Sequence, residues 1–538
     1  MSGRLLIVLA GLLMTACATP QQPAQGAPAS AQPKPGGTLN MRWAEDPWNW
    51  DISLVRTSPN DRGVALAYDT LLSFKSGPGV DYNDGVLIPH LADRWEVSPD
   101  AKVSTFYLRK GVKFAPFPKV EGVNGRELTS ADVKWSYEYG SRTGQFQGQP
   151  AGEYGFMFEG LDRVDTPDPY TVVVRFKEPF APFPNYAAAN WNAIMPKEIH
   201  GLDGHLKDRI VGTGPYQVDL DASQKGTRWI WKKNPDYWEA GKPYIDQIRA
   251  LVIQDESAMI AAFNTKQVDL LDALLPLEHA DQISRGAPDA TVFTIEAGYP
   301  WAFYINQTKP PFDDERVRRA LSLSLDRDEM IKVFQKGQGI PQLPAVFTGY
   351  FTEQEVRQLQ PYDPERAKRL LAEAGHPNGL EFEWTFSRTT GDWYVKVLEL
   401  IQAQAKKTGF TINLKALDQQ AFSANLRILN HVISLQPGSS RRWDIDLSFA
   451  DWHPNARVNY HGVKDPKLAT LIDGQRAVGD PAKRRETIRE MVKYMMEKQY
   501  GIGLYTQVRY NAWYPYIKNF QPNWNLLVPP LEHAWLEK

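Results

Sequence analysis

Short stretches of alternating apolar and polar residues predict β-strands in the first half of the chain. Thr38–Trp43 is apolar at every second position and predicts one strand. Residues 93–109 and 163–176 each predict a hairpin, because two strand-like runs flank a turn rich in proline, serine or aspartate. Between the hairpins, Thr129–Asp132 resembles a capping box that opens a helix through Tyr137. This part of the chain therefore mixes hairpins with occasional helix.

Helical periodicity dominates further along the chain. Asp313–Leu325 carries apolar residues at helical spacing, which predicts a helix with one buried face. Asp326 can cap the next helix, with Glu329 three positions later. Asp-Pro pairs at 363–364 and 480–481 each predict a helix start, because aspartate caps the helix and proline suits its first position.

Residues 380–414 give the most informative pattern. Leu380–Phe386 alternates as a strand does, Val397–Ala405 has helical spacing, and Phe410–Leu414 alternates again. Strand, helix and strand in this order predict a βαβ unit with parallel strands and a right-handed crossover. Ile445–Phe449 also alternates, and we expect it to form a further strand of the same sheet.

The first 36 residues differ in character from the rest. Met1–Ala16 has a basic Arg4 before a short apolar run, which predicts a signal peptide, too short to span a bilayer as a mature helix. Met14–Cys17 resembles the bacterial lipobox, which implies cleavage before Cys17 and lipidation there; plain secretion is the alternative. Residues 18–36 contain no large apolar side chain and predict a flexible tether to a body outside the cytoplasm.

Length and composition narrow the classes of function. The 538 residues exceed the roughly 250–300 that one hydrophobic core supports, so two or more lobes are expected. Sixty-one basic and 63 acidic residues leave a net charge of −2, without the basic excess typical of nucleic-acid binding. Cys17 is the single cysteine of the sequence, which excludes a disulfide within the chain and a thiolate metal site. The 17 tryptophans suit large cores and binding clefts alike.

Two charged residues follow the ends of predicted strands. Arg388 lies two residues after Phe386, and Asp451 lies two residues after Phe449. Open parallel sheets bind ligands in the crevice outside the carboxyl ends of their strands. If both side chains face one crevice, they suit the carboxylate and the ammonium of a zwitterion. The alternative is that each is a solvated loop charge, or that the two form a structural pair.

Short stretches spread over nearly the whole body carry a family resemblance. In chain order they are Gly36–Leu39, Leu91–Asp100, Leu108–Phe114, Ser130–Val133, Val211–Tyr216, Asn234–Trp238, Arg316–Ser322 and Asp326-Arg327. Each stretch alone is weak evidence. Together, in this order and behind a lipobox, they resemble the bacterial extracellular solute-binding proteins of the dipeptide, oligopeptide and nickel group, which serve ATP-binding-cassette importers.

The resemblance implies an α/β fold of the two-lobe periplasmic-binding-protein type, a type II-like clamshell with an extra inserted subdomain. Lobe I is expected to comprise residues 37–70, 212–299 and 507–538, the inserted subdomain residues 71–211, and the α/β lobe residues 300–506. Closure about a hinge is expected to trap the ligand and to create the form that the permease recognises. The expected partners are a ligand and permease subunits, with the membrane reached only through the lipid anchor. We expect a monomer without nucleic acid, cofactor or metal.

At the site the resemblance is narrower. Arg388 resembles the position at which dipeptide-binding members hold the ligand carboxylate, and Asp451 the position at which peptide-binding members hold the α-ammonium. Further expected contacts are aromatic: Trp301, Tyr304, Trp443 and Trp452. A di- or oligopeptide is therefore the expected ligand. An oligosaccharide is the alternative, because tryptophans that include Trp43, Trp48 and Trp50 could stack on sugar rings, although most are expected to be structural.

No motif for chemistry stands out, and we expect no enzymatic activity. Gly212–Pro215 starts like a dinucleotide fingerprint but lacks its third glycine, so it indicates a tight crossing between lobes. Walker, Gly-x-Ser-x-Gly and His-Glu-x-x-His sequences are missing. A secreted glycoside hydrolase stays open as an alternative, because such an enzyme needs only two suitably placed carboxylates.

Overall fold

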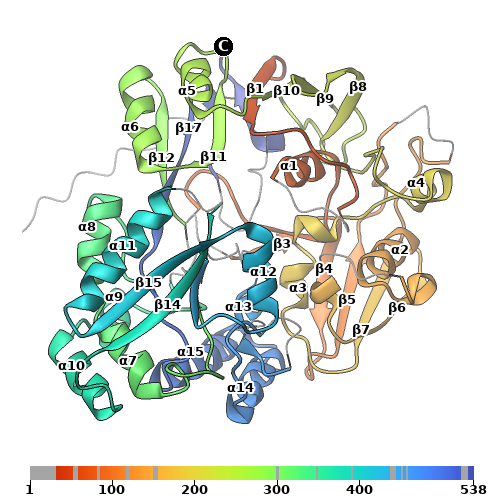
Figure 1. Cartoon of the computed structure of the whole chain (residues 1–538). Coiled ribbons are helices and arrows are strands. Elements are labelled where there is room, and N and C mark those ends of the chain that lie inside the picture. Colours follow the sequence, from red (N-terminus) through yellow and green to blue (C-terminus); the bar gives the residue numbers. More distant parts are fainter. Residues whose placement is uncertain are drawn as a thin grey trace, which may run out of the picture.

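A computed structural model describes residues 32–52, 58–80, 85–116, 122–149, 155–297, 302–346, 349–388, 392–436, 444–449, 452–455, 459–522 and 531–538. The predicted signal peptide and Cys17 lie outside these residues. In the described part of the chain, three larger sheets with their helices form the molecule (Figure 1).

The first part, called lobe I here, is built on a sheet of seven strands. In sheet order they are β12 (Thr291–Ala297), β17 (Gln507–Trp513), β11 (Leu270–Leu275), β1 (Thr38–Trp43), β10 (Gln247–Val252), β9 (Arg228–Lys233) and β8 (Tyr216–Gln224). β1 is parallel to both of its neighbours, and it confirms the strand predicted at Thr38–Trp43. The helices of lobe I are α1 (Ser58–Ala67), α5 (Glu256–Asn264) and α6 (Leu277–Gly286).

The second part, called the insert, is built on an antiparallel sheet of four strands. The order is β4 (Ala92–Val97), β5 (Val103–Leu108), β7 (Thr171–Phe176) and β6 (Leu161–Asp168), which confirms both predicted hairpins. The helices α2 (Ser130–Ser141), α3 (Phe183–Tyr186) and α4 (Lys197–Asp203) accompany it, with the short pair β2 (Leu72–Phe74) and β3 (Leu87–Pro89). The predicted capping box is confirmed at α2, where the N–H of Thr129 donates to the Asp132 carboxylate at 2.9 Å.

Lobe I and the insert share one hydrophobic core. A single cluster of buried side chains contains Leu39 and Trp231 from lobe I together with Phe106 and Phe183 from the insert. At the return from the insert, a methyl group on Gly212 would lie 2.2 Å from the carbonyl oxygen of Ala67, so only glycine fits there. The two parts therefore form one packed body.

The third part, called the α/β lobe, has its own core around a sheet of four strands. The order is β13 (Ala302–Ile305), β16 (Ile433–Gln436), β14 (Leu380–Ser387) and β15 (Phe410–Leu417). β14 and β15 are parallel and are joined by α11 (Asp392–Lys406), which confirms the predicted βαβ unit. The fully buried Trp384 lies in this core and not in the core of lobe I.

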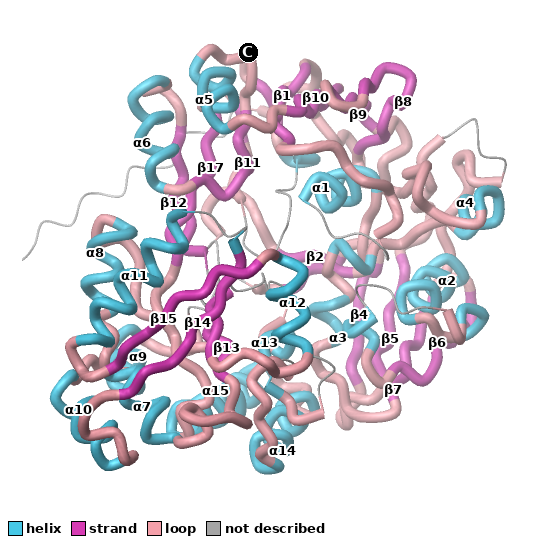
Figure 2. Tube along the Cα trace, in the orientation of Figure 1, coloured by secondary structure: helices cyan, strands magenta, loops and turns pink. Residues whose placement is uncertain are grey.

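Helices surround the sheet of the α/β lobe (Figure 2). They are α7 (Glu315–Leu323), α8 (Arg327–Gln335), α9 (Glu353–Leu359), α10 (Pro364–Glu373), α12 (Gln419–Arg427), α13 (Asp446–Phe449), α14 (Pro466–Arg476) and α15 (Pro481–Glu497). The predicted aspartate caps are confirmed at α8, α10 and α15, since Asp326, Asp363 and Asp480 each accept a backbone N–H of the first turn.

The strand predicted at Ile445–Phe449 is wrong, because residues 446–449 form the short helix α13. The Asp444 carboxylate accepts the N–H of Asp446 at 2.8 Å, which turns the chain at the point where a strand would begin. Ile445 and Phe449 are four residues apart, and both are buried in one cluster with residues of α14 and α15. The sheet position beside β14 belongs instead to β16.

Candidate functional site

Three parallel strands of the α/β lobe end at one edge of its sheet. Ser387 at the end of β14 pairs in register with Leu417 at the end of β15, and β16 runs parallel to β14. Figure 1 shows β14 and β15 running from the outer side near α10 toward the middle of the molecule, where α12 begins. The Ser387 hydroxyl donates to the side-chain oxygen of Gln419 in the first turn of α12 at 2.7 Å. This edge is where ligands bind in open parallel sheets.

Arg388 lies at this edge, as predicted. Its side chain is exposed and directly follows β14. Within the part of the chain that the structure describes, no hydrogen bond or ion pair joins its guanidinium to another residue. An arginine has five N–H donors in a planar fork that matches a carboxylate. The geometry therefore leaves a cation available for an anionic partner.

Three other predicted site residues, Trp301, Trp443 and Asp451, lie outside the described residues. The placement of Asp451 at a strand end rested on the strand at Ile445–Phe449. Since that segment is the helix α13, the strand argument for Asp451 no longer holds, and its role stays a prediction from the family resemblance.

Trp452 and Tyr304 are brought together through one histidine. The rings of Trp452 and His461 stack with centroids 3.5 Å apart, and the ring of Tyr304 lies 5.4 Å from the same imidazole. Both predicted residues are buried, and Trp452 belongs to the hydrophobic cluster of α13–α15. Both side chains therefore pack in the interior of the α/β lobe.

The tryptophans that could stack on a sugar ring are either buried or exposed. Trp43 and Trp50 are buried and contact Trp231 in the core of lobe I, with centroids 6.1 and 5.8 Å away. Trp48, in the loop after β1, has 71% of its surface exposed. Of the described tryptophans in that set, Trp48 alone presents an open face.

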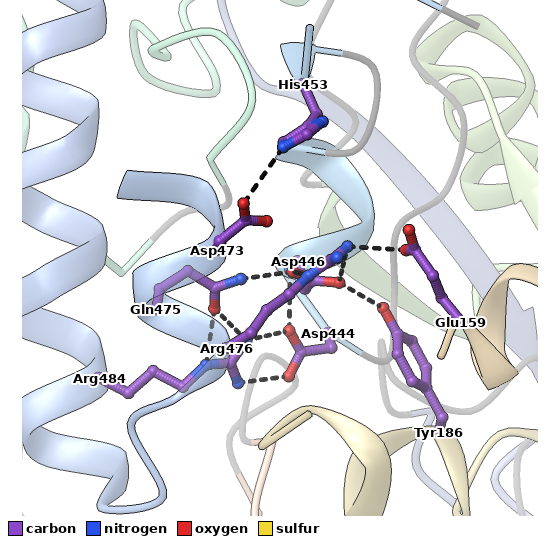
Figure 3. Close-up of polar contacts among 9 residues, drawn as sticks. All are labelled: Glu159, Tyr186, Asp444, Asp446, His453, Asp473, Gln475, Arg476 and Arg484. Atoms are coloured by element: carbon purple, nitrogen blue, oxygen red, sulfur yellow. Dashed lines mark hydrogen bonds and ion pairs between the residues drawn. The ribbon is translucent and has the colours of Figure 1, made fainter. Parts of the chain in front are cut away.

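A network of buried charges lies where the α/β lobe meets the insert (Figure 3). Arg484 of α15 holds the Asp444 carboxylate at two points, with nitrogen–oxygen distances of 2.6 and 2.7 Å. Arg476 of α14 holds Asp446 in the same manner, at 2.7 and 3.1 Å. Gln475 links the pairs, because its amide donates to Asp446 and its oxygen accepts from Arg484 at 2.7 and 2.8 Å.

The insert contributes to this network from the other side. The Asn185 amide donates to Asp444 at 2.6 Å, and the Tyr186 hydroxyl donates to Asp446 at 3.4 Å. The N–H of Ala181 donates to the Arg476 carbonyl at 2.8 Å, and Glu159 pairs with the Arg476 guanidinium at 3.1 Å. These contacts join the two bodies of the molecule away from the strands that cross between them.

Burial and neighbouring charges shift the pKa values of Tyr186 and Arg484 in this network. Burial raises the pKa of Tyr186 well above its usual value, and the carboxylates of Asp446 and Asp444 raise it further. Burial alone would lower the pKa of Arg484, but the Asp444 carboxylate more than offsets this and the pKa is raised. The tyrosine therefore stays a hydrogen-bond donor, and the arginine stays charged.

Sequence reasoning missed this network entirely. Asp444 and its partner Arg484 are 40 residues apart, and Asn185 is 259 residues from Asp444. The one local signal is Asp444-Ile445-Asp446, two carboxylates beside apolar residues. Its alternation favoured a strand, which hid the possibility that both carboxylates face buried partners.

Among the described residues, no three or more histidine, cysteine, aspartate or glutamate side chains gather as metal ligands would. None of the helices in the described ranges has both the length and the apolar character needed to cross a bilayer.

Comparison with known proteins places this architecture in a family. The family model for bacterial extracellular solute-binding proteins, family 5 Middle, matches residues 86–461. The chain is 28% identical over 409 residues to Di/tripeptide-binding protein 2 of Pseudomonas aeruginosa (strain UCBPP-PA14), covering 73% of each chain. It is 28% identical over 455 residues to the dipeptide-binding protein of Escherichia coli (strain K12), covering 80% of this chain and 82% of that one.

Solved structures of solute-binding proteins have the same fold as this chain. The structure of HbpA2 from Haemophilus parasuis superimposes with a TM-score of 0.78 at 22% identity, covering 93% of this chain and 100% of that one. The fold is therefore the α/β two-lobe fold with an inserted subdomain. With 376 consecutive residues inside the family model (86–461), the chain belongs to the family 5 bacterial extracellular solute-binding proteins, the extracytoplasmic binding proteins of ATP-binding-cassette importers.

Proposed function

We propose that this chain captures a small peptide, a di- or oligopeptide, between its two lobes and delivers it to the permease of an importer. The observation that carries the proposal is the exposed guanidinium of Arg388, which has no partner among the described residues and lies at the carboxyl edge of the sheet. A free peptide carboxylate is a planar anion that such a side chain binds at two points. The relatives named for di- and tripeptide binding support this substrate class.

We also propose how the protein is attached to the cell envelope, how its chain is divided into lobes and that it is a monomer. Lipidation at Cys17 would anchor the chain to the membrane and leave residues 18–36 as a tether. The three-part division of the chain, with lobe I assembled from residues 37–70, 212–299 and 507–538, belongs to the same proposal. We propose a monomer, because each lobe has its own core and capture needs only two lobes.

A thermal-shift screen tests the substrate class. Free-carboxylate dipeptides and tripeptides, their C-terminal amides, oligosaccharides and divalent metals are each added to the purified protein. A ligand at 100 times its dissociation constant adds about 2.7 kcal/mol to the free energy of unfolding. We expect the melting temperature to rise with free peptides and to rise less with their amides. A rise with oligosaccharides alone, or release of sugars from them, would replace the peptide assignment.

A further inference from the structure

The contact between the insert and the α/β lobe has two unequal halves. In the α/β lobe, the carboxylates of Asp444 and Asp446 are balanced by the guanidinium groups of Arg484 and Arg476. Each carboxylate is held at two points by its own arginine, and Gln475 joins the pairs (Figure 3). This half is therefore electrically neutral and complete without the insert.

The half on the insert consists mainly of neutral donors. They are the Asn185 amide, the Tyr186 hydroxyl and the backbone N–H of Ala181. Glu159 is the charged member, but 60% of its side chain is exposed, so water screens its pair with Arg476. When the lobes separate, neither half is left with a buried unpaired charge, because water replaces the neutral donors. The contact can therefore form and break without a large penalty on either side.

Other contacts between the two bodies lie near the chain crossing. The N–H of Val508 in β17 donates to the Gln335 side chain at 3.1 Å, and the Tyr510 hydroxyl donates to Gln338 at 2.7 Å. In Figure 1, α3, α13 and α14 lie away from β17 and α8. A hinge motion separates groups far from the hinge more than groups beside it. Opening would therefore break the contact at α3 first.

We propose that the insert supplies one half of a closure latch, in which Asn185 and Tyr186 bind the carboxylates of Asp444 and Asp446 only when the lobes are closed. The latch holds a fraction of the protein closed without ligand and slows opening once ligand is bound. This inference rests on the proposed capture between two lobes. A hydrogen bond to a charged group shifts an equilibrium by about tenfold or more, which is enough to change the closed population measurably.

Single-molecule energy transfer between the two bodies tests the latch without any ligand. Cys17 is the single cysteine of the sequence, so dyes can be placed on Leu202→Cys in the insert and Tyr362→Cys in the α/β lobe in a Cys17→Ser background. Both positions are exposed. Asn185→Ala with Tyr186→Phe removes both side-chain donors, keeps the buried ring and leaves the α/β-lobe half intact. We expect the ratio of closed to open molecules to fall by about tenfold or more.

The matched control is Glu178→Gln, which breaks an exposed ion pair with Lys102 within the insert and should leave the ratio unchanged. The single variant Asn185→Ala should lower the ratio of closed to open molecules by a smaller factor. It provides the same test if the double variant folds poorly. An unchanged ratio in the double variant, or no closed population in the unliganded wild type, would overturn the latch. Failure of peptides to bind, with the ratio still shifted, would overturn the proposed substrate and leave the latch standing.

Discussion

Replacing Arg484 with methionine is expected to lower the free energy of unfolding by about 3–5 kcal/mol. Arg484 is 11% exposed and neutralises Asp444, whose side chain is 1% exposed. Without the guanidinium, Asp444 would retain the Asn185 amide and the N–H of Asp446 but no opposite charge of its own. A buried carboxylate without a cation costs far more than the lost attraction between the two groups. Denaturant titration followed by far-ultraviolet circular dichroism measures the loss.

Arg357→Met is the matched control in the same lobe. Arg357 also has two acidic partners, Asp328 and Glu353, but its side chain is 43% exposed. Solvent screens such pairs, so the change in the free energy of unfolding should stay within about 1 kcal/mol. Equal losses in the two variants would show that burial does not distinguish the network from ordinary surface pairs.

Replacing Arg388 with alanine is expected to weaken binding of a free-carboxylate peptide by about 30-fold or more. Since Arg388 is exposed and has no protein partner among the described residues, the melting temperature should change little. The amide of the same peptide lacks the anionic carboxylate, so the wild type and the variant should bind it equally. Titration calorimetry with the peptide and its amide measures both effects.

Arg369→Ala is the control for the loss of one arginine. Arg369 is exposed on α10, near the opposite edge of the sheet, and has no partner in the described part of the chain (Figure 1). Its removal should leave peptide affinity unchanged. If Arg388→Ala and Arg369→Ala bind the free peptide as the wild type does, Arg388 is not part of the ligand site.

Local patterns were sufficient for elements whose signal lies within one segment. The βαβ unit at 380–417 could be predicted because strand alternation, helical spacing and strand alternation follow one another without interruption. Helix starts at Asp326, Asp363 and Asp480 could be predicted because a cap bonds the backbone two or three residues away.

Prediction from periodicity failed where a short segment fits both the spacing of a strand and the spacing of a helix. Ile445–Phe449 alternates, yet Ile445 and Phe449 are also one helical turn apart, so five residues cannot separate a strand from a helix. The Asx bond from Asp446 to Asp444 and the packing against α14 and α15 decided the outcome.

The functional residues also differ in whether sequence alone could place them. Arg388 could be placed from sequence, because it depends only on the end of β14. The charge network around the latch could not, because its members come from α3, from Asp444 and α13, and from α14 and α15, and only the tertiary fold brings them together. Trp452 was expected to contact the ligand because it follows a predicted site residue, Asp451. In the structure its side chain packs into a hydrophobic core.

Small-angle X-ray scattering with and without a saturating dipeptide tests most directly whether the two bodies close on a ligand. The two-lobe account predicts that the radius of gyration decreases on saturation, and that the scattering profile approaches the one calculated from the present structure, in which the insert contacts the α/β lobe. A radius of gyration unchanged under conditions in which calorimetry shows full occupancy would contradict capture by closure.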